Sequence, residues 1–176
     1  MRLSPLKALR IRAKPGDPRR GVLVAGQQML PVALGRGSTR ANKREGDGGT
    51  PRGTFRPLRL WWRADRAPRP ATVLPSRPIR SDDGWCEDPR DRAYNRPVKL
   101  APNSPADRLW RQDRLYDLIV EIDHNTRPRI AGRGSAVFIH VARPGFAPTA
   151  GCVALEPKAL RRLLARLGPR TRLVIG

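Results

Sequence analysis

Cys152 and His140 are the two side chains of this sequence whose types and spacing could do chemistry together. Both lie in residues 138–155, which read FIHVARPGFAPTAGCVAL. The thiolate form of cysteine is a nucleophile, and a neighbouring imidazole can take the thiol proton. Cysteine is also among the most buried residue types, and a lone histidine can be a satisfied core residue. The pair therefore predicts either a nucleophile with its base or two residues of a packed interior.

The residues before Cys152 suit the first interpretation. Gly151 precedes the thiol directly, and glycine lets the backbone adopt conformations that other residues avoid. The N–H groups of Gly151 and Cys152 could then point at a developing oxyanion. Thr149 lies in the same turn and is a candidate substrate contact. Nearby cationic charge would favour the thiolate.

Cys86, the second cysteine, is a poor nucleophile candidate. Glu87 and Asp88 follow it directly, and acidic neighbours raise the pKa of a thiol. A disulfide to Cys152 would silence an enzyme, so we expect Cys86 to be free. The chain has no Cys-x-x-Cys motif and its histidines lack ligand spacing, so we predict no metal and no cofactor.

Length and composition limit the classes of protein to which the chain can belong. A chain of 176 residues that is 39% hydrophobic suits one globular domain with a real core. No apolar run reaches the roughly 18 residues of a membrane-spanning helix. The basic N-terminus has no apolar stretch typical of a secretory signal. The compartment and the oligomeric state stay open.

The net charge of +21 comes from 36 Lys and Arg against 15 Asp and Glu. Such a balance attracts polyanions: nucleic acid, anionic lipid or an acidic wall polymer. A nucleic-acid surface usually concentrates its charge and interleaves aromatic residues. Here the basic residues are spread along the chain and aromatics are 5%. We expect no specific nucleic-acid partner, and a basic binding module without catalysis is the alternative to an enzyme.

Strands and one helix surround the candidate pair. Residues 136–141 predict a strand in which Ala136, Phe138 and His140 share one face, with the residues between them on the other. Residues 115–123 predict a second strand and residues 171–176 a last one. Residues 156–168 predict a helix with a leucine stripe that ends at Gly168.

The rest of the chain predicts short strands and loops. Residues 1–18 look like a loose basic lead-in to a domain over 19–176. Residues 21–26 and 28–34 predict a hairpin whose second strand is an edge strand, because Pro31 cannot donate to a neighbour. A loop over 36–53 precedes a strand over 54–62. Residues 103–113 predict a short helix, with Ser104 as N-cap and Pro105 at its first position.

Residues 63–104 are rich in Pro and Arg and cannot hold a long helix. We interpret them as an irregular insertion packed over the core. Trp85, Tyr94 and Asn95 could line a binding cleft or form a small core of the insertion itself. His124 could line the same cleft, or it could simply serve a turn together with its polar neighbours. Strands followed by a late helix, with no βαβ alternation, predict a mainly β, mostly antiparallel single domain with a few short helices.

Two motifs together resemble the L,D-transpeptidase catalytic domain of the YkuD type. The first is EGDGGTPRGTF over residues 45–55, with Gly46, Thr50, Pro51, Gly53 and Phe55 at the motif positions. The second combines YDLIVEIDHN with HVARPG and GCVAL. The resemblance covers about residues 20–176 and is fairly specific, because the two motifs occur together. It implies a β-sandwich or barrel fold.

The resemblance also implies a reaction on the peptidoglycan stem peptide. Cys152 would attack the carbonyl between an L-centre and a D-residue, giving a thioester. His140 would take the thiol proton and later deliver it, and Gly151 and Cys152 would hold the oxyanion. An amine acceptor would give a cross-link, and water would give trimming. The family also implies the periplasm or cell envelope, and no cofactor.

The sequence departs from the family pattern after the cysteine. Ala154 stands where most members have Arg or Asn, Thr149 stands where most have Ser, and the loop from histidine to cysteine is short. The substrate-holding role of the missing polar residue does not carry over. An L,D-carboxypeptidase, an amidase or an enzyme for another substrate of the same fold therefore stays open beside cross-linking.

Overall fold

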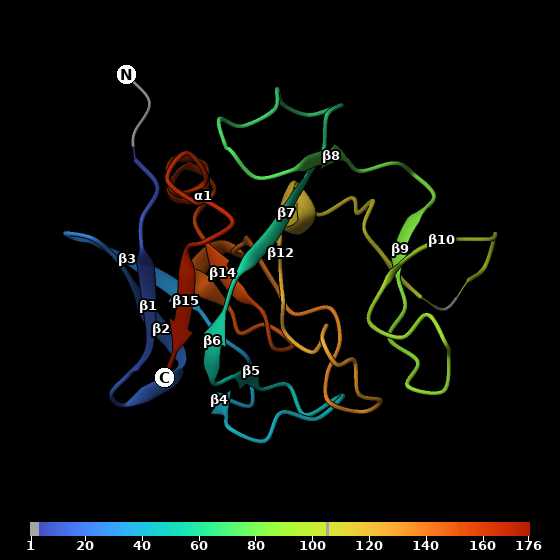
Figure 1. Ribbon diagram of the computed structural model, residues 1–176, viewed down its shortest axis with the longest axis horizontal. Coiled ribbons are helices and arrows are strands. Elements are labelled where there is room, and N and C mark those ends of the chain that lie inside the picture. The colour runs from blue at the N-terminus through green and yellow to red at the C-terminus, as the bar shows by residue number, and fades with distance from the viewer. Residues whose placement is uncertain (1–3, 105) are drawn as a thin grey trace.

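The computed structural model describes residues 4–104 and 106–176, and strands dominate it (Figure 1). Its strands are β1 (Ala8–Lys14), β2 (Asp17–Ala25), β3 (Gln28–Ala33), β4 (Thr39–Arg40), β5 (Thr50–Pro51), β6 (Gly53–Phe55), β7 (Pro57–Trp62), β8 (Ser76–Pro78), β9 (Asp83–Trp85), β10 (Pro97–Lys99), β11 (Asp107–Arg108), β12 (Leu118–Ile122), β13 (Phe138–Val141), β14 (Val153–Leu155) and β15 (Arg172–Ile175). Helix α1 spans Pro157–Leu164, and the short 3-10 turns η1 and η2 span Arg114–Tyr116 and Pro144–Phe146. The predicted mainly β fold is confirmed.

Ten strands form one mixed sheet in the order β6-β15-β1-β2-β3-β14-β13-β12-β7-β8. Most neighbours are antiparallel, but β1 with β15, β13 with β14 and β7 with β8 are parallel. Strands β6 and β7 lie near opposite ends of this order, although only Arg56 separates them in the chain. The sheet must therefore curl back on itself, which gives the barrel-like form that the sequence predicted.

The two faces of the curled sheet carry two separate apolar clusters. The larger cluster contains the inward residues of β1, β2 and β15 and one face of β7, β12 and β13. The smaller cluster lies on the other face of β7, β12 and β13, around Trp61, Ile119 and Phe138. Residues Val137, Ile139 and Val141 belong to the first cluster, while Ala136 and Phe138 belong to the second. The predicted period-two division of this strand is confirmed.

Helix α1 covers the larger cluster. Pro157 at its first position and the Glu156 carboxylate, which accepts from Ala159 N at 2.9 Å, begin the helix. Leu160, Leu163 and Leu164 bury its apolar face. The helix ends at Leu164, four residues before the predicted end, although Leu167 is also fully buried.

Two predicted elements are wrong. The loose lead-in becomes regular structure at Ala8, where β1 pairs with both β2 and β15 and buries Leu9 and Ile11 completely; residues 1–3 lie outside the described part. The predicted helix over 103–113 is replaced by bends, by β11 and by the approach to η1. Ser104 Oγ still accepts from Ala106 N at 3.4 Å, and Pro105 lies outside the described residues.

Other predicted elements need smaller changes. The strand over 54–62 is split into β6 and β7 at Arg56. The hairpin of β2 and β3 is confirmed. The predicted edge position of β3 is wrong, because β3 lies between β2 and β14 in the sheet. It pairs with β14 only at Ala33, so the ladder to β14 does not reach Pro31.

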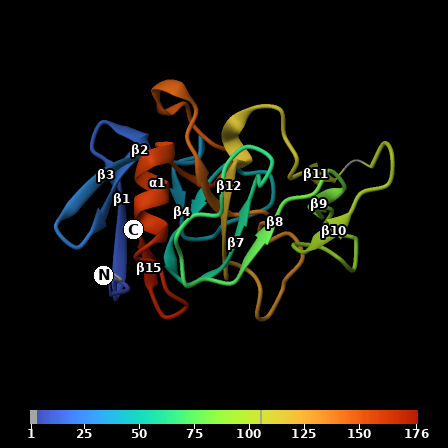
Figure 2. The ribbon, with the colours of Figure 1, turned by 90° about the horizontal axis from the view of Figure 1, so that it is seen from above.

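The insertion over 63–104 packs against the smaller cluster. Its strand β9 pairs with β10 on one side and with β11 on the other. This small sheet extends away from β1, β15 and α1, toward the opposite side of the molecule (Figure 2). Ile79 and Trp85 anchor it on Trp61 and Phe138. The predicted packing of the insertion over the core is therefore observed.

Candidate active site

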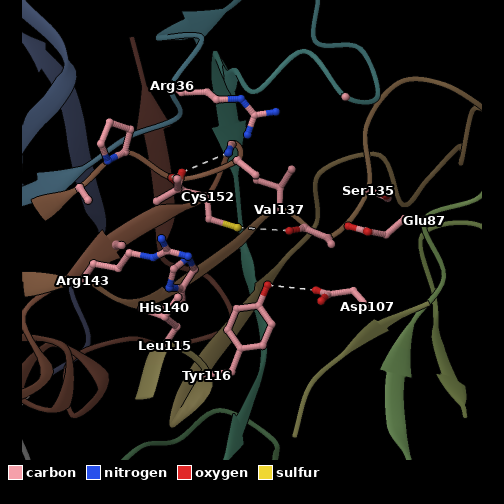
Figure 3. Close-up of a pocket in the computed structure, with 18 of the residues that line it drawn as sticks. Arg36, Glu87, Asp107, Leu115, Tyr116, Ser135, Val137, His140, Arg143 and Cys152 are labelled. Carbon is pink, nitrogen blue, oxygen red and sulfur yellow. Dashed lines mark hydrogen bonds between the residues drawn. The ribbon is translucent and has the colours of Figure 1, made fainter. Parts of the chain in front are cut away.

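Parallel pairing of β13 and β14 brings the histidine and the cysteine to one cavity. His140 pairs with Ala154 in the register of the two strands, and Cys152 immediately precedes β14. Both residues line a cavity of about 480 Å³ (Figure 3). The segment between them crosses over through η2, as a parallel pair requires. The sequence separation thus becomes spatial proximity.

Thr149 fixes the turn that presents the thiol. Its Oγ1 donates to Cys152 O at 2.7 Å and accepts from Gly151 N at 3.1 Å. The N–H of Gly151, expected as an oxyanion donor, is therefore already used inside the turn. The N–H of Cys152 has no partner in the described part of the chain. Thr149 lines the cavity, yet its polar contacts here are with the turn itself.

Glycines let three backbone segments meet behind this turn. Gly151 has φ +140°, and a Cβ built on it would lie 2.8 Å from Gly49 O. A Cβ built on Gly35 would lie 2.1 Å from Gly48 O. Thr50 accepts from Gly35 N at 2.8 Å and is fully buried. The glycine-rich motif over 45–55 is thus the wall against which the cysteine turn is packed.

The thiol of Cys152 is buried and protonated. Its Sγ donates to Ala136 O at 3.2 Å and accepts from Phe138 N at 3.4 Å. Burial raises the pKa of Cys152 to about 12, although Phe138 N–H and the distant charge of Lys43 act in the opposite direction. Cationic charge favours the thiolate as predicted, but desolvation is the larger effect and keeps the thiol protonated.

The imidazole of His140 is neutral and oriented. Its Nδ1 lies 2.8 Å from Val141 O, and a carbonyl can only accept, so Nδ1 carries the proton and Nε2 is left basic. Burial lowers the pKa of His140 to about 4. The ring of Tyr116 meets the imidazole edge to face, with ring centres 5.4 Å apart. A neutral base and a neutral thiol thus share one cavity.

Charges of opposite sign lie on different walls of the cavity. Arg36 and Arg143 lie on the side of Cys152 and His140, whereas Glu87 and Asp107 lie across from them (Figure 3). Asp107 accepts from Tyr116 Oη at 3.1 Å. Arg111 and Lys43 also line the cavity, paired with carboxylates. The cavity can therefore hold a ligand with groups of both signs.

Three expected substrate contacts do not line this cavity. Trp85, Tyr94 and Asn95 are each at most 4% exposed. Trp85 Nε1 donates to Asn95 Oδ1 at 3.0 Å, and Asn95 Nδ2 donates to the carbonyls of His124 and Asn125. The alternative interpretation, a small core of the insertion, accounts for all three side chains.

His124 and Cys86 also lie apart from the reacting pair. His124 Nε2 donates to Arg133 O at 3.0 Å, and its ring packs on Phe55 with centres 5.5 Å apart. These contacts fit the turn interpretation. Cys86 is buried and free, and burial, with Asp91 and Asp88, raises the pKa of its thiol. The predicted free thiol is confirmed.

Several cavity residues were given no role from the sequence: Arg36 and Asp107 lie outside the two motifs, and Glu45 and Tyr116 lie in them at positions to which no role was assigned. Arg36, Glu45, Asp107 and Tyr116 come from four separate segments that only the folded chain brings together. In the described part of the chain, no group of three or more His, Cys, Asp or Glu side chains is arranged to hold a metal ion. No helix there is long and apolar enough to cross a membrane.

The structure is thus a mainly β domain in which a curled mixed sheet places a buried histidine and a buried cysteine at one cavity. The family model of the L,D-transpeptidase catalytic domain, YkuD, matches residues 11–175, nearly the whole chain. The chain belongs to this family of enzymes, as the two motifs indicated. No curated protein and no solved structure matches the chain.

Proposed function

We propose that this protein is a cysteine acyltransferase that acts on peptidoglycan stem peptides by the L,D route. The observation that carries the proposal is the neutral pair of Cys152 and His140 in one cavity, with Nδ1 of the imidazole held by Val141 O. A fixed tautomer leaves Nε2 as the only ring atom that can accept a proton. Family membership supports the substrate class.

Acylation begins with proton transfer. As Sγ of Cys152 attacks the carbonyl carbon between the L-centre and the D-residue, its proton passes to Nε2 of His140. The carbonyl oxygen takes the negative charge, and Cys152 N–H, which has no partner among the described residues, donates to it. The tetrahedral intermediate collapses, the C–N bond breaks, and the imidazolium returns the proton to the leaving amine. A thioester remains.

Deacylation repeats these steps with a new nucleophile. An acceptor amine gives up a proton to His140 and attacks the thioester carbon, and the C–S bond then breaks to restore the thiol. Water in place of the amine gives an L,D-carboxypeptidase. Ala154 in place of Arg or Asn is the feature that keeps trimming as the second candidate, because a side chain of β14 that could hold substrate is replaced by a buried methyl group.

Intact-mass measurement after incubation with a carbapenem, and separately with a stem tetrapeptide, tests the proposal. We expect a mass gain of one drug molecule in the native protein and in Cys86→Ala, and none in Cys152→Ala. Product analysis with and without an acceptor amine then separates cross-linking from trimming. An adduct that survives Cys152→Ala would refute the assigned nucleophile. Binding to an anionic polymer with no adduct in any variant would favour the basic binding module.

A further inference from the structure

Among the described residues, Glu87 is the one acidic side chain with no hydrogen-bond or ion-pair partner. The chain has 15 Asp and Glu, all in the described part, and 36 Lys and Arg. The fourteen others each accept a hydrogen bond or form an ion pair. Glu87 is exposed, so water can solvate its carboxylate in the free protein, and it lines the cavity of Cys152, where a bound ligand would meet it.

The backbone that carries Glu87 is held firmly. Cys86 N donates to Arg96 O at 2.9 Å, and Asn95 N donates to Cys86 O at 2.8 Å. Strand β9 ends at Trp85, two residues before Glu87, and Trp85 pairs with Asp107 of β11. Pairing in this small sheet therefore places Glu87 and Asp107 on the same wall of the Cys152 cavity. Asp107 is occupied by Tyr116, so Glu87 is the carboxylate available to a ligand.

The opposite wall carries the complementary charge. Arg36 and Arg143 flank Cys152, and neither guanidinium has a side-chain hydrogen bond or ion pair in the described part of the chain (Figure 3). Guanidinium groups bind carboxylates and carboxylates bind ammonium groups, in each case with charge-assisted hydrogen bonds. A ligand that spans the cavity across the thiol would meet cations on one side and an anion on the other.

The surroundings make the charge of Glu87 costly when the cavity is empty. Glu87 is an exposed residue, but desolvation by the adjoining cavity wall, with repulsion from Asp107 and Glu45, raises its pKa to about 7. Lys43 and Arg111, the other cations of the cavity, are engaged by carboxylates of their own. A ligand ammonium placed beside Glu87 would favour its ionised form.

We propose that Glu87 is a specificity-determining residue that binds a primary ammonium of the acyl donor, whose carboxylate faces Arg36 and Arg143. This inference rests on the proposed function. It makes the preferred donor a zwitterionic peptide with a free side-chain amine next to the scissile bond. The ammonium bound by Glu87 is distinct from the amine that attacks the thioester, which must be neutral to react.

Two donor peptides, identical except that the side-chain amine of one is acetylated, test the inference. We expect the native protein to prefer the free amine by about 10-fold to 100-fold in kcat/KM, the range of one charge-assisted hydrogen bond. Glu87→Gln should remove this preference by lowering kcat/KM for the free-amine donor. Asp88→Asn is the matched control, because Asp88 is the next residue, is exposed and is already paired with Arg90.

The outcomes separate the two proposals. A preference that persists in Glu87→Gln, or native turnover that is equal for both donors, would overturn the role of Glu87 and leave the acyl transfer standing. Native protein that processes neither donor would overturn the proposed function itself. Alkylation of Cys152 by iodoacetamide, measured in each variant, checks that the thiol stays accessible and that the fold is intact.

Discussion

The proton of the reacting pair belongs to sulfur rather than to imidazole at neutral pH. Burial raises the pKa of Cys152 to about 12 and lowers the pKa of His140 to about 4, so a preformed thiolate and imidazolium pair is disfavoured in the free protein. Attack must then couple to proton transfer, and substrate binding must bring the two atoms into line. Cys152 is therefore activated as a serine hydroxyl is, by losing its proton to histidine during attack, and not as the thiolate of a preformed ion pair.

Alkylation of Cys152 by iodoacetamide should therefore rise with pH without levelling off between pH 6 and 9. A thiol below its pKa gains thiolate tenfold for each pH unit, and a pKa near 12 puts any plateau above this range. Mass spectrometry in a Cys86→Ala background measures the rate at one site. A plateau with a midpoint below pH 7 would contradict the neutral pair.

At the scale of elements, the site is held by contacts between segments far apart in the chain. The Glu45 carboxylate accepts from Tyr94 Oη and from Ser135 Oγ, so one side chain joins the glycine-rich motif, the insertion and the segment before β13. Tyr94 Oη also accepts from Gly134 N at 3.0 Å. These bonds explain why Tyr94, expected to contact substrate, is instead a buried part of the scaffold.

A double-mutant cycle between Glu45→Ala and Tyr94→Phe should give a coupling energy of about 1–2 kcal/mol in unfolding free energy. The two groups share a hydrogen bond in the interior, so removing either one already costs most of the interaction. Urea denaturation of the four proteins measures it. Asp88→Ala with Tyr94→Phe serves as the control pair and should be additive, and additivity in the first pair would refute the link.

Replacing Gly151 by alanine should cost about 3–5 kcal/mol in stability, with loss of acylation. The new Cβ would lie 2.8 Å from Gly49 O, at a φ of +140° that alanine rarely adopts. Gly132→Ala is the control for conformation alone, because φ there is +75° and nothing lies within 4 Å of the new Cβ. It should cost about 1–2 kcal/mol. Equal melting temperatures for the two variants would contradict the close packing.

Local sequence patterns predicted the elements in which buried and exposed residues alternate regularly. They failed where contacts with distant segments determine the secondary structure. The faces of β13 followed from its period of two. Strand β1 carries the same alternation, with Leu9 and Ile11 alternating with Arg10 and Arg12, but its many charges made it resemble a lead-in. Residues 103–113 have helix-start signals, yet pairing of β11 with β9 and burial of Leu109 favour an extended path. Such pairing is invisible to a local pattern.

Considering the whole molecule, the reacting residues could be predicted and the rest of the cavity could not. Motif spacing identified His140 and Cys152 because both lie in one short segment. The charged walls come from the loop after β3, from the insertion and from β11, so their meeting depends on how the sheet curls. Trp85 and Asn95, which were predicted to line a binding cleft from their residue types alone, are hydrogen-bonded to each other.

Acid should destabilise the whole fold partly through His140. Its pKa is about 4 when folded and near 6.5 when unfolded, so between these values the unfolded chain binds a proton that the folded one excludes. Stability from this group is present above pH 6.5 and is lost as the pH falls toward 4, by about 2–3 kcal/mol at pH 4.5. His124, whose pKa is also lowered by burial, acts in the same direction.

Urea denaturation at pH 7.5 and pH 4.5, for the native protein and for His140→Gln, measures this contribution. The loss of unfolding free energy on acidification should be about 2–3 kcal/mol smaller in the variant, since carboxylates and His124 contribute equally to both proteins. The same loss in both proteins would show that His140 is already accessible to protons in the folded state.

The place of β15 in the sheet has a consequence for how the chain is made. β15 lies between β6 and β1, so it is the shared neighbour of two strands that are synthesised much earlier. Until β15 is synthesised, β1 and β6 each have a strand edge without its partner. Cooperative folding therefore depends on contacts between residues far apart in the sequence. Topologies with such distant contacts fold slowly, and open strand edges invite association with other chains. The ten-stranded sheet can therefore be completed only after β15 has been synthesised.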